Sequence, residues 1–311
     1  MKLITCIGVE HDLALLAHFV EHYRRLGIAH GSMIAILNTC DEASARLSQA
    51  RQFAEERGLV VEEWIAPYTS EAMWEKRREV QARHCVAEDW VISADVDEFH
   101  EYPEDLPRFL ARCEAMAVDV VQGPFIDRLA PGGRLAAVNA DRPLGDQFPL
   151  RAAAMDVVGG AGAHHTRHST VKVMAMRGCV QPRRGGHDPL PVPGLGWLYG
   201  ASLGQFALLD APAFRFAVPT RVNHYHWTDR LIHSLKIRLA TPGVSAAGRE
   251  YGARQLRYLE RNDGIALDEV ETERISFPRE SWPRQLTRMR RRGALMNLAY
   301  RARRTLLGEP A

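Results

Sequence analysis

Short apolar runs alternate with helical patterns along the first part of the chain. Apolar runs at residues 2–9, 33–37, 60–65, 90–94 and 118–121 are each followed by polar or glycine residues, which is typical of buried strands. Between them, residues 13–26, 42–57, 70–87 and 106–116 have the spacing of helices. Strands that alternate with helices in this way predict an α/β fold, with a mostly parallel sheet covered by helices on both faces.

The pattern changes after Gly123. Gly, Pro and His become frequent in segments 131–133, 159–162, 185–187 and 191–194, which predicts irregular loops and short strands. From residue 283 onward arginine is dense, with leucine and methionine interspersed. We therefore predict two halves of one domain, residues 1–125 and 126–260, followed by a helical basic tail over residues 261–311.

Composition limits the class of protein. The chain has 311 residues, an apolar fraction of 46%, a charged fraction of 25% and a formal net charge of +2, which is an ordinary globular profile. The apolar N-terminal run stops at Glu10, too early for a signal peptide, and no run is long enough to span a bilayer. Its 5 cysteines form no C-x-x-C pair, so neither a disulfide framework nor a thiolate zinc site is indicated. We expect a cytoplasmic location.

An acidic motif follows the strand predicted at residues 90–94. Asp95, Asp97 and Glu98 place three carboxylates within four positions, where they repel one another unless a cation neutralises them. Mg²⁺ or Mn²⁺ would do so and would also bridge the phosphates of a nucleotide. Asn38 and Asp41 follow another strand and should share this edge of the sheet, where ligands bind in such folds. The alternative is an acid-rich turn that backbone amides stabilise.

Several segments of the chain form a recognisable series. The acidic motif ends a DWVISADVDEF stretch at residues 89–99. In order along the chain, the other segments are EHYRRLG at 21–27, Arg77 with Gln81, and NHYHW at 223–227 with Ser234 and Lys236. Together they resemble the bacterial glycosyltransferase family 2 proteins and their family 92 relatives, in which a D-x-D-E-F motif follows a D-W-V strand. The resemblance covers residues 1–240, and each piece alone is a weak signal.

This resemblance implies a GT-A (Rossmann-like) fold that uses a nucleotide diphosphate sugar, with residues 1–125 binding the donor and residues 126–260 the acceptor. Asp95 would contact the ribose or the metal ion, and Asp97 would be the main metal ligand, with Glu98 supporting them. A late histidine completes the metal site in many members. His187 and His224 are the candidates, and the glycines beside His187 favour it because they let a backbone approach closely.

The residues for proton transfer and phosphate binding are less defined. The family's downstream E-D motif is absent, so Asp188, Asp127 and Asp156 remain alternatives for the general base of an inverting transfer. Arg77 lies in the donor half, and Lys172 is a candidate for pairing with the diphosphate, as are Arg183 and Arg184. The alternative for Lys172, Arg183 and Arg184 is that they are solvated residues of basic loops.

Other clusters have ordinary explanations beside the functional ones. The histidines of segment 164–168 would either form a polar loop or bind a transition metal. His22 would make a structural contact. His226 and Trp227 would either stack on a sugar or base, or form an ordinary buried pair. The basic tail would contact an anionic membrane surface, here the inner one, or lie solvated on the domain. No nucleic-acid fold signature accompanies it.

The sequence thus predicts a metal-dependent glycosyltransferase that transfers a sugar to a hydroxyl of a glycan, lipid-linked or small acceptor. Two alternatives remain open: a non-catalytic nucleotide or carbohydrate-binding protein of the same fold, and a nucleotidyltransferase or metal-dependent phosphohydrolase. The donor sugar, the acceptor and the oligomeric state do not follow from the sequence.

Overall fold

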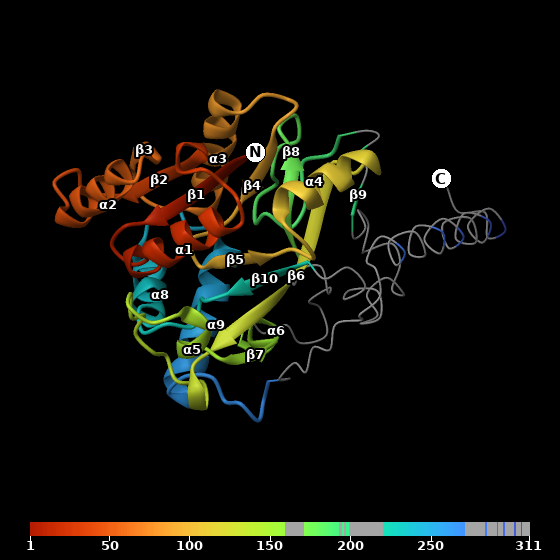
Figure 1. The fold of residues 1–311 in the computed structure, drawn as a ribbon. Coiled ribbons are helices and arrows are strands. Elements are labelled where there is room, and N and C mark those ends of the chain that lie inside the picture. The colour runs from red at the N-terminus through yellow and green to blue at the C-terminus, as the bar shows by residue number, and fades with distance from the viewer. Residues whose placement is uncertain are drawn as a thin grey trace.

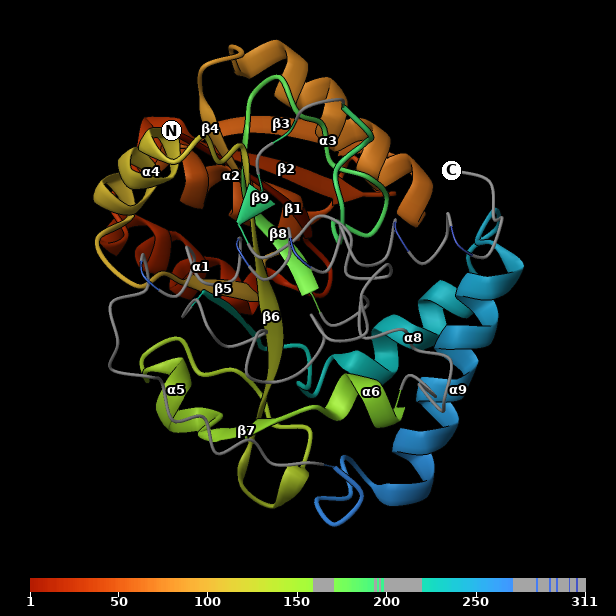
Figure 2. The ribbon, with the colours of Figure 1, turned by 90° about the vertical axis from the view of Figure 1, so that its right-hand side faces the viewer.

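A curled mixed sheet with helices on both sides organises the protein (Figures 1 and 2). The computed structural model describes residues 1–158, 171–192, 195, 197–198 and 220–270, and five single positions beyond residue 283. Along the main path the strand order is β3-β2-β1-β4-β8-β6-β10-β5, and β7 and β9 each pair with β6.

The first half of the sheet is parallel. β1 (Lys2–Gly8) lies between β2 (Met33–Thr39) and β4 (Trp90–Ser93), and β2 pairs with β3 (Val60–Ile65). The connections are α1 (Leu13–Arg25), α2 (Ala45–Glu56) and α3 (Ser70–His84), with a short η1 (His30–Ser32) before β2. These elements match the predicted strands and helices, which confirms the α/β class with a Rossmann-like parallel half.

Helices cover both faces of this half because alternate strand residues point to opposite sides. Leu3 and Ile7 of β1 belong to the core cluster that includes α1, α2 and α4 (Leu106–Ala115). Ile4 and Cys6 belong to a second cluster, on the side of α3. A sheet buried on both faces explains why these strands are continuous apolar runs in the sequence.

The second half of the sheet is mixed in direction. β8 (Val171–Arg177) is antiparallel to both β4 and β6 (Val120–Leu129), β6 is parallel to β10 (Arg221–His224), and β10 is antiparallel to β5 (Glu98–Glu101). β7 (Leu150–Ala152) and β9 (Trp197–Leu198) extend this part. The chain therefore forms long strands in a region that the sequence predicted as short strands and loops.

Short and long helices complete the second half. They are η2 (Pro131–Gly133), α5 (Leu144–Gln147), α6 (Ala154–Val158), α8 (Leu231–Ala240) and α9 (Ala246–Asn262). Leu235 of α8 and Leu259 of α9 are buried in a third core cluster with Trp227. This cluster fixes the segment after β10, which leads into α8.

The predicted domain boundaries and the predicted basic tail remain predictions. β6 crosses the predicted boundary at residue 125, so the two halves share one sheet. Apart from its first residues, which include the end of α9, the predicted basic tail lies almost entirely outside the described residues. None of the helices in the described part of the chain is long and apolar enough to cross a membrane.

Candidate functional site

The acidic motif lies between β4 and β5, and two buried cations hold its first carboxylate. Arg77 of α3 donates from Nη2 to Asp95 and, over 3.0 Å, from Nη1 to Ser93 Oγ. Lys172 Nζ of β8 lies 3.3 Å from Asp95 Oδ2 and 2.6 Å from Glu98 Oε1. Arg77 is 1% exposed and Lys172 is 4% exposed, so solvent screens these contacts little.

This arrangement corrects one premise of the sequence argument. We expected the clustered carboxylates to need a bound metal ion, but the chain supplies its own cations to Asp95 and Glu98. Burial disfavours the Asp95 charge, yet Arg77 and Lys172 outweigh it and lower the Asp95 pKa. Burial raises the pKa of Glu98 to about 7 although Lys172 opposes this. The acidic motif is therefore compensated on one side without a metal ion.

Asp97 points to a different set of partners, two histidines at the end of β10. Its Oδ2 atom lies 3.5 Å from His224 Nε2 and 3.3 Å from His226 Nδ1. The two imidazoles are stacked, with centroids 5.0 Å apart and planes 10° apart. Burial works against the Asp97 charge, but His224 and His226 hold the Asp97 pKa well below its usual value.

A second carboxylate orients His224 from behind. His224 Nδ1 donates to Asp127 Oδ1 over 2.9 Å, and the other Asp127 oxygen accepts from the Met155 amide over 2.7 Å. Burial disfavours the imidazolium, yet Asp97 and Asp127 raise the pKa of His224 to about 10. Asp127 is 2% exposed and both its oxygens are engaged, so the structure favours an orienting role over the predicted role as general base.

Two groups of side chains could hold a metal ion among the described residues: Asp97 with His224 and His226, and Asp95 with Asp97 and Glu98. In each group the ligand atoms lie within 4.8 Å of one another. His226 Nε2 is buried and has no hydrogen-bond partner within the described part of the chain, which fits a site that is completed by another group. A carboxylate with two imidazoles suits Mn²⁺ or another transition metal better than Mg²⁺, which prefers oxygen ligands.

The structure brings His224, not His187, to Asp97. His187 belongs to neither metal-ligand group, and its Nδ1 atom donates to the Val171 carbonyl over 2.7 Å. Burial, with Lys172 nearby, lowers the pKa of His187 to about 4. The glycines do allow close approach: at Gly186, with φ +67°, an added Cβ would lie 2.7 Å from Lys172 Cε. They bring this loop against Lys172 instead of Asp97.

His226 was missed as a candidate ligand because its neighbour Trp227 suggested an aromatic pair. The available signal was the spacing of the two histidines: His224 ends β10 and His226 follows two positions later, the spacing at which residues of an extended segment share a face. Trp227 is fully buried in the third core cluster, as its structural alternative predicted.

Asp12 is a further carboxylate that the sequence assigned only to helix capping. It occupies the N-cap position of α1, but its side chain makes no capping hydrogen bond. Burial, followed by the charge of Asp97, raises the Asp12 pKa to about 7. An acid that follows the carboxyl end of the central strand β1 was the signal for a role in the site.

Asn38 and Asp41 follow β2 as predicted, but their contacts are local. The Asn38 amide donates to the carbonyls of Trp64 and Ala66, each over 2.9 Å, and fastens β2 to the end of β3. Asp41 Oδ1 accepts from the Ala43 amide over 2.9 Å in the turn before α2. Both contacts stabilise this edge of the sheet.

The remaining candidates are spread around this edge. Asp188 accepts from Gln122 Nε2 over 3.4 Å. Arg184 contacts Ser70 Oγ at 3.3 Å, and Lys236 of the family-like late segment pairs with Glu260 at 3.3 Å on the surface. The side chain of Asp156, the histidine segment 164–168 and most of the arginine-rich tail lie outside the described residues.

Comparison with known proteins identifies no family. No family model and no curated protein matches the sequence. Among solved structures, S. aureus TarS 1-349 aligns with a TM-score of 0.35 and 11% identity, over 84% of this chain and 72% of that chain. A 4-diphosphocytidyl-2C-methyl-D-erythritol synthase aligns with a TM-score of 0.26 and 15% identity, over 44% and 67%. Such distant similarity leaves function to be argued from the site.

Proposed function

We propose that the protein is a metal-dependent transferase that moves a sugar from a nucleotide diphosphate sugar to a hydroxyl acceptor. The observation that carries the proposal is the convergence of Asp97, His224 and His226 beside a cation-held Asp95, at the carboxyl edge of a Rossmann-like sheet. The family resemblance of the acidic motif and of residues 223–227 agrees with it.

Asp97, His224 and His226 would hold Mn²⁺, with Asp95 positioned for the ion or the donor ribose. When bound, such an ion would neutralise charge on the diphosphate leaving group. Asp127 would keep His224 in the tautomer that presents Nε2 to the ion. Arg77 and Lys172 would keep Asp95 ionised and fixed in place through their direct contacts with it.

The acceptor hydroxyl must lose a proton during transfer, so a carboxylate with a suitable pKa should lie at the site. Asp188 remains the candidate from the sequence. Asp12 is a second one, because its pKa of about 7 suits a general base near neutral pH. Direct attack by an activated hydroxyl would invert the anomeric centre, which is the outcome we expect.

Activity with a panel of UDP and GDP sugars, in Mn²⁺ and in EDTA, tests the proposal. We expect release of a nucleoside diphosphate that depends on Mn²⁺ and falls about 100-fold or more in Asp97→Asn and about 10 to 100-fold in His226→Gln. Glu88→Gln, on the exposed surface, is the matched control and should retain full activity.

Four outcomes would count against the proposal. A folded protein that binds no nucleotide from the panel would exclude a nucleotide-sugar enzyme of this kind. Undiminished activity in Asp97→Asn would remove the site from the reaction. Pyrophosphate as the first product would indicate nucleotidyl transfer, and binding without turnover would indicate a non-catalytic binding protein.

A further inference from the structure

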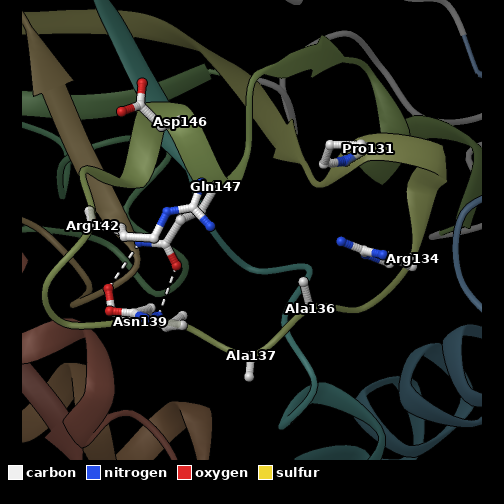
Figure 3. A pocket seen from close by; sticks show the side chains of 9 residues that line it. Pro131, Arg134, Ala136, Ala137, Asn139, Arg142, Asp146 and Gln147 are labelled. Carbon is white, nitrogen blue, oxygen red and sulfur yellow. Dashed lines mark hydrogen bonds between the residues drawn. The ribbon is translucent and has the colours of Figure 1, made fainter.

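A hollow of about 450 Å³ lies inside the loop that connects β6 to β7. Its lining includes Arg134, Asn139, Arg142, Asp146 and Gln147 (Figure 3). This loop follows the carboxyl end of β6, the strand that carries Asp127, but the hollow contains none of the residues assigned to the metal site.

A buried glutamine fixes the shape of this loop. Gln147 Nε2 donates to the carbonyls of Asn139 over 2.8 Å and Arg142 over 2.6 Å, and its Oε1 accepts from the Asn139 amide over 2.7 Å. Only 9% of Gln147 is exposed. His18 of α1 also contacts the Asn139 carbonyl at 2.9 Å. The loop is thus held in one conformation by its own side chain, as a preformed binding site would be.

Two other contacts attach the loop to neighbouring elements. Gly133 has φ +74°, and the Ile265 amide after α9 donates to its carbonyl over 2.8 Å; an added Cβ would lie 2.0 Å from the Ile265 oxygen. Ala136 forms a β-bridge with Thr228 and accepts from the Asp229 amide over 3.1 Å. Thr228 is two residues beyond His226, so this bridge attaches the loop to the segment that follows the candidate metal ligands.

The charges at this hollow are not matched within the protein. Arg134 and Arg142 are exposed and lie on opposite sides of it in Figure 3. Within the described part of the chain, neither guanidinium forms an ion pair or a side-chain hydrogen bond. Arg112, by comparison, is an arginine that does have a partner, since it pairs with Glu104 at 2.9 Å. Asp146 is the one carboxylate in the lining. Two uncommitted guanidinium groups around a rigid hollow are suited to a phosphate or carboxylate group.

We propose that this hollow binds an anionic group of the acceptor, a phosphate or a carboxylate, held between Arg134 and Arg142. That the anion is part of an acceptor depends on the proposed function, whereas the anion site itself does not. The acceptor is favoured over the donor because the lining residues, 131–147, belong to the predicted acceptor half, and because the Ala136–Thr228 bridge joins this loop to the segment after β10. An acceptor anchored here would extend toward His226.

Calorimetric titration in EDTA, where the metal site cannot contribute, tests the anion site. The probes are glycerol 3-phosphate and glycerate, which carry a phosphate and a carboxylate on a similar frame. We expect at least one of the two probes to bind, and the probe that binds more strongly will show whether the hollow prefers a phosphate or a carboxylate. Arg134→Gln and Arg142→Gln should each weaken binding about tenfold, as loss of one charge-assisted contact would. Arg57→Gln, at the exposed C-cap of α2, is the matched control and should leave binding unchanged.

Asp146→Asn separates charge from shape. Because it removes the opposing charge, it should strengthen anion binding. If Asp146→Asn weakened binding as much as the arginine variants do, the effects of all three would reflect a disturbed loop, and the proposal would be overturned. No binding of either probe at 10 mM ligand, or binding that both arginine variants retain, would overturn the proposal. Nucleotide binding measured on the same variants should be unchanged. If the protein bound the anion but no nucleotide, the proposed function would be rejected while the anion site would stand.

Discussion

Lys172→Met should reveal how much the protein depends on its internal cation. Lys172 is 4% exposed, and its Nζ lies 2.6 Å from Glu98 Oε1 and 3.3 Å from Asp95 Oδ2. Methionine has a similar length, so it fills the space but leaves Glu98, which is 1% exposed, without its cation. Removing one partner of a buried ion pair typically costs about 3–5 kcal/mol. With an m-value of about 3 kcal/mol/M, the urea midpoint should fall by about 1 M or more.

The loss should depend on pH in a defined direction. Burial raises the pKa of Glu98 to about 7, and Lys172 counteracts that rise, so the pKa should increase further in the variant. A carboxyl group whose folded-state pKa exceeds its unfolded value destabilises the fold as pH rises through the folded-state pKa. At pH 5.5 Glu98 can take up a proton, and the destabilisation should be smaller than at pH 8.

Urea unfolding in EDTA, followed by circular dichroism at both pH values, measures these effects. The double variant Lys172→Met with Glu98→Gln should recover part of the loss, because it removes the buried charge together with its partner. Lys236→Met, which breaks an exposed pair with Glu260, should cost about 1 kcal/mol or less. If Lys172→Met cost no more than this control, or cost the same at pH 5.5 and pH 8, the electrostatic reasoning would be wrong.

Three further predictions concern the site itself. Asp97 and Asp127 raise the pKa of His224 to about 10, so Mn²⁺ must displace a proton from this imidazole when it binds. Calorimetry should therefore show that the affinity for Mn²⁺ rises up to about tenfold per pH unit between pH 6 and 8. An affinity independent of pH would contradict this. In the same titration Asp127→Ala should weaken Mn²⁺ binding about 10 to 100-fold, and Asp127→Asn less. Transfer rates should rise through pH 7 as Asp12 ionises, and Asp12→Asn should abolish that rise while Asp188→Asn preserves it; the opposite result would assign the base to Asp188.

The first half of the fold could be predicted from the amino-acid pattern. Strands buried on both faces must be apolar throughout, and the helices between them keep a helical spacing, so β1 to β4 and their helices could be predicted from pattern alone. The acidic motif followed for the same reason, since it begins where the apolar strand ends. Asp95 and Asp97 are therefore predictable as an edge cluster.

Only the tertiary structure decided what these carboxylates face. Lys172 lies 77 positions from Asp95, and His226 lies 129 positions from Asp97, so no local pattern could pair them. Antiparallel β8 inserts beside β4, and β10 returns beside β6, which brings both residues to the motif. Sequence distance carries no signal for such pairing, because it depends on strand order in the completed sheet. The same strand order turned Asp127 toward His224 and left His187 beside Lys172.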